Sequence, residues 1–425
     1  MQPDEMILVS VDDHLVEPPD MFEDHLPAKW RSLAPVMTRL DDGSDAWSFD
    51  GRVFPNFALN AVAGRPKEEY GVEPTNFEEI RPGCYDPTAR LKDMDAAGVL
   101  ASMCFPTFPG FSGRQFAVVQ DKEFALDLVR AYNDWHIDTW CATAPDRLIP
   151  MAIPVLWDPD LAAQEVRRTA AKGCHSVTFT ENPAKLGYPS FHDPHWDPFW
   201  KALCDTGTIL SIHLGSSGSL AVTADDAPMD VMITLQPMNI AYAAADLLWS
   251  RVLKEFADIR IALSEGGTGW IPYFLDRVDR TYDMHHLWTG QQFGHLLPSE
   301  VFRQHFLTCF IHDPVGVELR HKIGIDNIAW EMDFPHSDSS WPDAPESLAT
   351  ELMGVPDDEV NAMSHGNALR WYSHDPYTRG LMPATATVHA LRQRALGHDT
   401  TIHATSRHNG TKNTDLAALS SKLNV

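Results

Sequence analysis

The sequence predicts an α/β protein, a (β/α)8 TIM barrel with a long insertion after the first strand and a C-terminal extension. Short β-type runs alternate with helical patterns over most of the 425 residues. Eight runs have strand character, at residues 6–11, 99–105, 148–155, 176–179, 208–213, 259–263, 305–311 and 327–330. Such alternation predicts a parallel sheet with crossover helices, and eight units favour closure into a barrel.

The segments between these runs support the closed barrel over an open sheet. Helical patterns occupy residues 87–97, 121–143, 161–171, 198–204 and about 229–256. An open doubly wound sheet should carry a Gly-rich phosphate-binding turn after its first strand. Here the first strand runs instead into Asp12-Asp13-His14.

Two regions do not fit the alternation and set the expected domain limits. We expect the barrel to occupy residues 1–373, with an insertion at about 18–82, and the extension to occupy 374–425. The insertion is rich in Pro, Gly, Asp and aromatic residues and is too long for an ordinary loop, so it predicts a lid, a cap or a subunit contact. Residues 400–412 are polar, which predicts disorder or a segment that wraps a partner.

Composition restricts the class of partner. The chain has 59 acidic and 33 basic residues, and its net charge of −26 argues against nucleic acid or an anionic membrane as partner. No apolar run approaches the roughly 18 residues of a membrane span. The six cysteines form no CxxC pair and resemble small buried apolar residues of a reducing compartment. We therefore expect a cytoplasmic protein, and the long insertion and the C-terminal extension further suggest a homo- or hetero-oligomer.

Residues suited to bind a metal follow four of the predicted strands. In such a barrel the active site lies at the carboxyl ends of the strands, where ligands from different segments can converge on one ion. Asp12 and His14 are one residue apart, so an extended strand points both to the same face. The predicted metal-binding residues are Asp12, His14, Glu17, His213, Glu265, Asp333 and His336.

Each of these residues also has an ordinary structural explanation. A single His after a strand is usually a hydrogen-bonded loop residue, and Asp333 suits a turn. Glu265 suits a helix entry, Glu17 suits the turn before Pro18, and His336 suits a role in orienting Asp333. Four predicted strands each end in a His or a carboxylate at the same end of the barrel, and this combination favours the metal site.

The motifs resemble those of the amidohydrolase-2 family, the metal-dependent branch that includes aminocarboxymuconate-semialdehyde decarboxylase and related aromatic-acid decarboxylases and hydrolases. The resemblance covers residues from about 7 to 372. It rests on the sequences VDDH at 11–14, SIHLG at 211–215, WEMDFPH at 330–336 and HGNA at 365–368. The resemblance implies metal ligands at His14, His213 and Asp333.

Two departures from the family pattern bear on the metal. The first family motif is usually His-x-His, and Asp12 stands where the first His belongs; the sixth strand usually carries an acid/base His, and Glu265 stands there. Both replace nitrogen with oxygen, and carboxylate-rich sites with some His favour iron or manganese over zinc. One or two ions of zinc, iron or manganese fit this set of residues.

Three functions follow from the resemblance and its departures. The first is hydrolysis or decarboxylation of a small organic substrate with a metal-activated water, with Asp333 and Glu265 as catalytic residues and with Trp270 and Phe105 lining the substrate pocket. The second is a dinuclear iron or manganese monooxygenase that hydroxylates its substrate and needs a ferredoxin and a reductase, as in a few similar proteins of this fold. The third is a non-catalytic subunit paired with an active paralogue. We rank them in this order.

Overall fold

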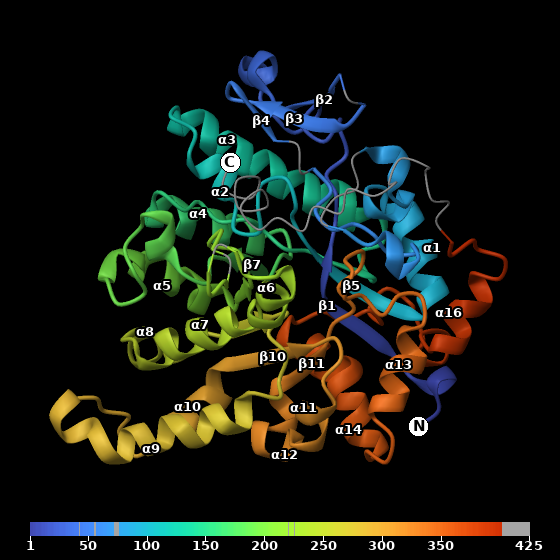
Figure 1. The fold of residues 1–425 in the computed structure, drawn as a ribbon. Helices are drawn as coiled ribbons and strands as arrows, with labels where there is room; N and C mark the ends of the chain where they lie inside the picture. Colours follow the sequence, from blue (N-terminus) through green and yellow to red (C-terminus); the bar gives the residue numbers. More distant parts are fainter. Residues whose placement is uncertain (42, 55–56, 72–75, 220, 225, 402–425) are drawn as a thin grey trace.

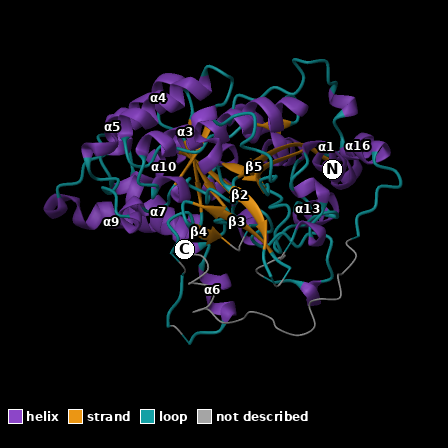
Figure 2. Cartoon of the chain, turned by 90° about the horizontal axis from the view of Figure 1, so that it is seen from above, coloured by secondary structure: helices purple, strands orange, loops and turns teal. Residues whose placement is uncertain are grey.

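A ring of parallel strands surrounded by helices forms the centre of the molecule (Figures 1 and 2). The computed structural model describes residues 1–425 except 42, 55–56, 72–75, 220, 225 and 402–425. The strands of the ring are β1 (Leu8–His14), β5 (Val99–Phe105), β6 (Leu148–Ile149), β7 (Ser176–Phe179), β8 (Ile209–His213), β9 (Ile261–Ser264), β10 (Phe306–Phe310) and β11 (Ile328–Trp330).

The helices lie between successive strands and continue after β11. They are α1 (Pro87–Ala97), α2 (Arg114–Ala117), α3 (Lys122–Trp135), α4 (Pro159–Ala170), α5 (Asp197–Thr206), α6 (Met229–Leu235), α7 (Met238–Trp249), α8 (Val252–Glu255), α9 (Ile271–Thr289), α10 (Pro298–His305), α11 (Pro314–Glu318), α12 (Arg320–Ile323), α13 (Ala344–Glu351), α14 (Asp357–Asn361), α15 (Asn367–Trp371) and α16 (Val388–Arg394).

Hydrogen bonds close the ring. The strands pair in the orders β1-β5-β6 and β11-β10-β9-β8-β7, and a bridge between Ala152 and Val177 joins the two sets after β6. On the other side, the His14 N–H donates to the Phe334 carbonyl (2.7 Å) and the Asp333 N–H donates to the Asp12 carbonyl (2.9 Å). The predicted eight-stranded barrel is confirmed.

Prolines account for two differences from the predicted elements. The strand expected at 148–155 ends after Ile149 because Pro150 has no N–H to donate, although Ala152 still bonds to β7. The single helical region expected at 229–256 is three helices, α6 to α8, and Pro237 lies at the first break. In the region expected to be one helix at 121–143, the α-helix ends at Trp135. A π-helical turn (His136–Trp140) and a 3-10 turn (Cys141–Thr143) follow it.

The C-terminal extension packs on the barrel through α16. Gly98 ends α1 in a left-handed conformation (φ +70°), and a Cβ built there would lie 2.7 Å from Val388 Cγ1 of α16. A glycine is required at this close approach. Of the polar stretch expected to be disordered or to wrap a partner, residues 402–412 lie outside the described residues.

The insertion after β1 contains a small antiparallel sheet of β2 (Val36–Arg39), β3 (Asp45–Phe49) and β4 (Arg52–Phe54), drawn at the top of Figure 1. Trp47 of β3 stacks on Phe108, which follows β5, with ring centroids 4.5 Å apart. Further along the insertion, the N–H groups of Val62 and Ala63 both donate to the Pro335 carbonyl (2.9 Å each). The insertion therefore lies at the carboxyl ends of β5 and β11.

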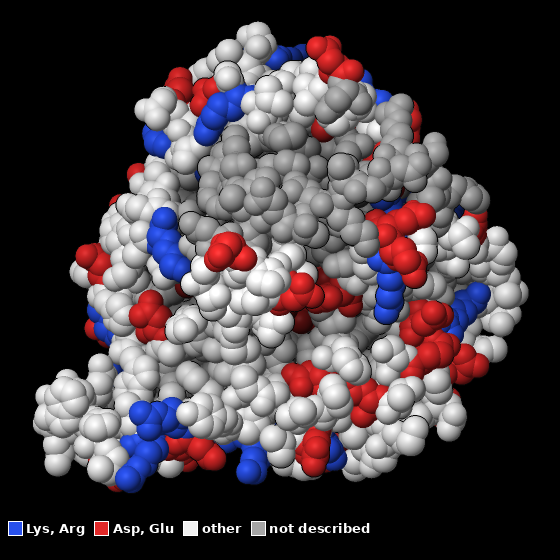
Figure 3. Space-filling model, viewed as in Figure 1, with Lys and Arg blue, Asp and Glu red and all other residues white. Residues whose placement is uncertain are grey.

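The described surface agrees with the acidic composition. On the face drawn in Figure 3, acidic side chains recur over the described surface, and the basic side chains form no continuous patch there. Among the described residues, no helix is both long enough and apolar enough to cross a membrane.

A buried arginine joins α1 to the end of β1. Arg90 has no exposed surface, and its guanidinium donates to the Gly83 carbonyl through Nε (2.6 Å) and to the His14 carbonyl through Nη2. It also lies 3.1 Å from Cys104 Sγ and over the ring of Phe334. One side chain thus fixes the carboxyl end of β1 against α1, β5 and the loop after β11.

We expect Arg90→Met to lower the free energy of unfolding by about 3 kcal/mol, because it leaves two buried carbonyls without a charged donor. Urea unfolding measures the change. The matched control is Arg280→Met, since Arg280 is exposed and pairs with exposed Asp283; we expect a change within about 0.5 kcal/mol there. Equal effects of the two substitutions would contradict the structural role of Arg90.

Candidate metal centre

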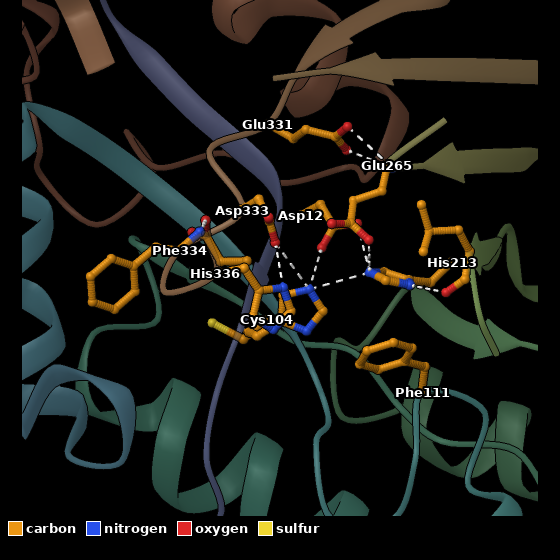
Figure 4. Close-up of polar contacts among 12 residues, drawn as sticks. Asp12, Cys104, Phe111, His213, Glu265, Glu331, Asp333, Phe334 and His336 are labelled. Carbon is orange, nitrogen blue, oxygen red and sulfur yellow. Dashed lines mark hydrogen bonds and ion pairs between the residues drawn. The ribbon is translucent and has the colours of Figure 1, made fainter. Parts of the chain in front are cut away.

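Six of the seven predicted metal-binding residues converge at the carboxyl ends of β1, β8, β9 and β11 (Figure 4). At the centre is His14, whose Nε2 lies 3.4 Å from Asp12 Oδ1 and 3.3 Å from Asp333 Oδ1. Asp12 and His14 lie on β1, and Asp333 follows β11, so the closure of the ring places them together.

His213 joins the cluster from the end of β8. Its Nε2 lies 3.0 Å from Glu265 Oε2, 3.2 Å from His14 Nε2 and 3.6 Å from Asp12 Oδ2. Its Nδ1 donates to the Leu214 carbonyl (2.6 Å), because a carbonyl can only accept. With the proton on Nδ1, a neutral imidazole carries its lone pair on Nε2, and Nε2 is then the atom that would bind a metal.

His336 joins the cluster from the loop after β11. Its Nδ1 lies 2.8 Å from Asp333 Oδ1, and its ring stacks on His14 with centroids 3.8 Å apart. Burial lowers the pKa of His336 to about 4, so the imidazole is neutral. The insertion holds this loop through its two bonds to Pro335.

The carboxylate oxygens of Asp12 and Asp333 lack hydrogen-bond donors within the described part of the chain. Among the described residues, neither oxygen of Asp12 or of Asp333 accepts a well-formed hydrogen bond, although imidazole nitrogens lie 2.8 to 3.6 Å away. Burial, together with the charges of neighbouring carboxylates, raises the pKa of Asp12 and of Asp333 well above the ordinary value. Burying oxygen and nitrogen atoms that lack hydrogen bonds costs free energy of folding. A divalent cation bound between them would offset that cost, because both kinds of atom can ligate it.

The donor atoms fall into two overlapping sets, in each of which all donor atoms lie within 4.8 Å of one another. One set consists of Asp12, His14 and His213, and the other of His14, Glu265, Asp333 and His336. Three imidazoles and three carboxylates fit manganese or iron, and the imidazoles also suit zinc.

Glu17 is not brought into the cluster. Its Oε1 accepts the Thr107 N–H (2.9 Å) and its Oε2 accepts the Phe108 N–H (2.8 Å), so both oxygens are occupied by the loop after β5. This role depends on a contact between segments about 90 residues apart, which the local sequence around Glu17 does not reveal.

Two carboxylates of the cluster lie on left-handed backbone. Glu265 has φ +54° and Asp333 has φ +56°, a conformation that residues other than glycine adopt rarely. Such conformations persist where the surroundings hold them, often at functional sites. Asp333 is held by the bond from its N–H to Asp12, and Glu265 by a bond from its N–H to the carboxylate of Glu331.

The sequence motifs contained two further acids whose roles we did not predict. Glu331 is fully buried and lies two residues before Asp333 in the chain. Asp13 accepts the Phe334 N–H (2.9 Å) and bonds with the hydroxyls of Ser10 and Ser102, so it ties β1 to β5 and to the loop after β11. Burial raises the pKa of Asp13 to about 6. The adjacent acids Asp12 and Asp13 at the end of a strand are the signal that marks Asp13, and Glu331 is marked by its place directly after β11 in the same motif as Asp333.

The aromatic residues near the cluster have different positions. Phe105 is fully buried, with its ring 4.8 Å from that of His213. Phe111, which we did not predict, lies closer to His213 (4.2 Å) and is partly exposed, so it faces the mouth of the barrel. Trp270 instead donates through its indole N–H to the carbonyls of Gly266 and Gly267 (3.0 and 3.1 Å) and supports the loop after β9.

Comparison with known proteins identifies the family. A family model described as amidohydrolase matches residues 49–373. The chain belongs to the amidohydrolase family. Asp12 and His14 precede the matched residues, and the other members of the cluster lie within them.

Among curated proteins, this amidohydrolase is similar to the gamma-resorcylate decarboxylase of Rhodococcus jostii, with 27% identity over 215 residues. The match covers 48% of this chain and 63% of that protein, so the chain spans less than two thirds of the relative's length.

Solved structures show the shared fold. An amidohydrolase from Mycobacterium avium subsp. paratuberculosis superimposes with a TM-score of 0.68 at 23% identity, covering 86% of this chain and 99% of that one. A 5-carboxyvanillate decarboxylase from Novosphingobium aromaticivorans, with bound manganese and 3-methoxy-4-hydroxy-5-nitrobenzoic acid, superimposes with a TM-score of 0.59 at 15% identity, covering 88% and 99%.

We expect His14→Ala to remove most of the bound metal, because His14 belongs to both donor sets. Elemental analysis of protein dialysed against Mn²⁺ gives the ions per chain. The matched control is His192→Ala, since His192 is half-exposed and pairs with Asp246 outside the cluster. Metal content that is unchanged in His14→Ala would contradict the site.

We expect metal-free protein to lose stability as pH rises, in part through Glu17. Burial raises the pKa of Glu17 from 4.5 to about 7. In that window the unfolded chain releases a proton that the folded protein retains, so stability falls by roughly 3 kcal/mol as pH rises through it. Urea unfolding of wild type and Glu17→Gln at about pH 5 and about pH 7.5 should show a shallower decline in the variant. An identical decline would contradict the shifted pKa.

Proposed function

We propose that this amidohydrolase is a metal-dependent lyase that decarboxylates a small aromatic carboxylic acid. The observation that carries the proposal is the convergence of buried imidazoles and carboxylates at the mouth of an amidohydrolase barrel, where, among the described residues, the oxygens of Asp12 and Asp333 accept no well-formed hydrogen bond. The gamma-resorcylate decarboxylase similar to it supports the reaction class, and the manganese in the similar decarboxylase structure supports manganese as the ion.

Asp12, His14 and His213 would hold this ion, and the carboxyl groups of Glu265 and Asp333 lie beside it. When bound, the cation supplies positive charge that binds the substrate carboxylate and an adjacent oxygen and withdraws electron density from the ring. Phe105 and Phe111 give the substrate ring an apolar wall beside the imidazoles and exclude water from that side.

Two carboxyl groups with opposite pKa shifts suit the proton transfer. Burial and the charge of Glu265 raise the pKa of Asp333. Burial also acts to raise the pKa of Glu265, but the neighbouring His213 and His336 and a bond with Asp333 together lower it below its ordinary value. Divergent shifts in one site indicate an acid and a base. Asp333 would protonate the ring carbon that carries the carboxylate, the carbon–carbon bond would break with release of CO2, and the bonding electrons would return to the ring. Glu265 would then accept a proton from water and pass it to Asp333, which restores the acid for the next turnover.

We expect Glu265→Gln, which preserves shape and removes the base, to lower the decarboxylation rate by about 100-fold or more. CO2 release from 2,6-dihydroxybenzoate and 5-carboxyvanillate in the presence of Mn²⁺ measures it. Glu255→Gln is the control, because Glu255 is an exposed residue of α8. A near-normal rate in Glu265→Gln would remove this residue from the mechanism, and no CO2 release by wild type from any hydroxybenzoic acid would refute the reaction.

A second function, a dinuclear iron or manganese monooxygenase, is supported by the two donor sets. Six donor residues are more than a single ion with a bound substrate needs, and three of them are carboxylates that can bridge ions. In the metal analysis above, two ions per chain, together with oxygen uptake that requires a reductant, would favour this function. One ion per chain and anaerobic CO2 release would favour the lyase.

A further inference from the structure

We propose that Glu331 is a positioning residue that sets the place of the Glu265 carboxylate in the metal centre. The inference rests on the proposed metal-dependent function. Glu331 is fully buried and directly follows β11, and its Oε1 and Oε2 lie 3.1 and 3.3 Å from the Glu265 nitrogen, whose N–H they accept (Figure 4).

The contact spans a strand. β10 lies between β9 and β11 in the sheet, so these two strands are not neighbours. The Glu331 backbone pairs with β10 through its N–H and the Phe310 carbonyl (3.0 Å), while its side chain reaches past β10 to the end of β9. A side chain of this length is required, because a shorter acid at the same position ends before β9.

The bond replaces one that the sheet does not provide. The register of β9 with β10 ends at Leu263 and Thr308, and that of β9 with β8 ends at Ser264 and His213. The N–H of Glu265 is therefore beyond both ladders, on left-handed backbone (φ +54°). Without an acceptor there, nothing in the sheet favours this conformation over an extended one.

A second carboxylate fixes the other end of the same loop. Asp313 Oδ2 accepts the N–H groups of Thr268 and Gly269 (2.6 and 2.5 Å). With Glu331 on the first residue of the loop and Asp313 on the fourth and fifth, the backbone that carries Glu265 is held on both sides. The Glu265 carboxylate is thereby placed 3.0 Å from His213 Nε2, within reach of a shared ion.

The experiment separates reach from charge with two variants of Glu331. Glu331→Gln keeps the length and one acceptor oxygen but loses the charge, whereas Glu331→Asp keeps the charge and loses the reach. Titration with Mn²⁺, followed by the EPR signal of free Mn²⁺, gives the affinity. If Glu331 positions Glu265, Glu331→Asp weakens binding by about 10- to 100-fold and Glu331→Gln binds nearly as wild type does.

The opposite order, weak binding in Glu331→Gln and normal binding in Glu331→Asp, would show a purely electrostatic role and overturn the inference, as would normal binding in both. Glu17→Asp is the control for shortening a buried carboxylate that accepts backbone N–H groups away from the donor atoms, and we expect its Mn²⁺ affinity to be unchanged. Wild type that binds no Mn²⁺, Fe²⁺ or Zn²⁺ would instead refute the proposed function. Circular dichroism verifies that each variant is folded.

Discussion

The backbone contact between β1 and the loop after β11 is the constraint on which the site depends. Two hydrogen bonds, from His14 to Phe334 and from Asp333 to Asp12, join the first strand of the barrel to the last. They lie between residues about 320 positions apart in the chain. The same residues carry the side chains at the centre of the cluster, so closing the barrel and assembling the site are one event.

Repulsion among buried carboxylates explains why many hydrogen bonds fix the backbone around the metal centre. Asp12, Glu265, Glu331 and Asp333 are carboxylates grouped in a barrel mouth where burial disfavours their charge. Folding can hold them together only if the backbone is fixed at each one, since mutual repulsion would otherwise separate them. The bonds to Asp333, the pair of carboxylates around the Glu265 loop and the anchoring of β1 by Arg90 supply that restraint.

The replacement of nitrogen by oxygen at Asp12 and Glu265 changes what the family's barrel offers a cation. Imidazoles leave an ion its full charge, whereas carboxylates partly neutralise it, so an ion held here would withdraw less electron density from a substrate than one held by imidazoles alone. Burial lowers the pKa of His14 and of His336, which favours the neutral imidazole that ligation requires, and the bond of His213 to the Leu214 carbonyl directs its Nε2 toward the cluster. The insertion contributes to this arrangement by holding the loop that carries His336.

The fold class and most residues of the site can be predicted from the amino-acid sequence. The alternation of strand and helix patterns predicts the eight-stranded barrel, and parallel topology then requires that residues ending different strands, such as His14, His213 and Asp333, lie at one end. Contacts between segments far apart in the sequence could not be predicted, because no local pattern links such segments. Glu17 was expected in the cluster, but its oxygens are occupied by the loop after β5. The role of Glu331 was not predicted. It depends on a side chain that reaches past β10 to β9, and this contact follows from strand order and side-chain length rather than from residue type.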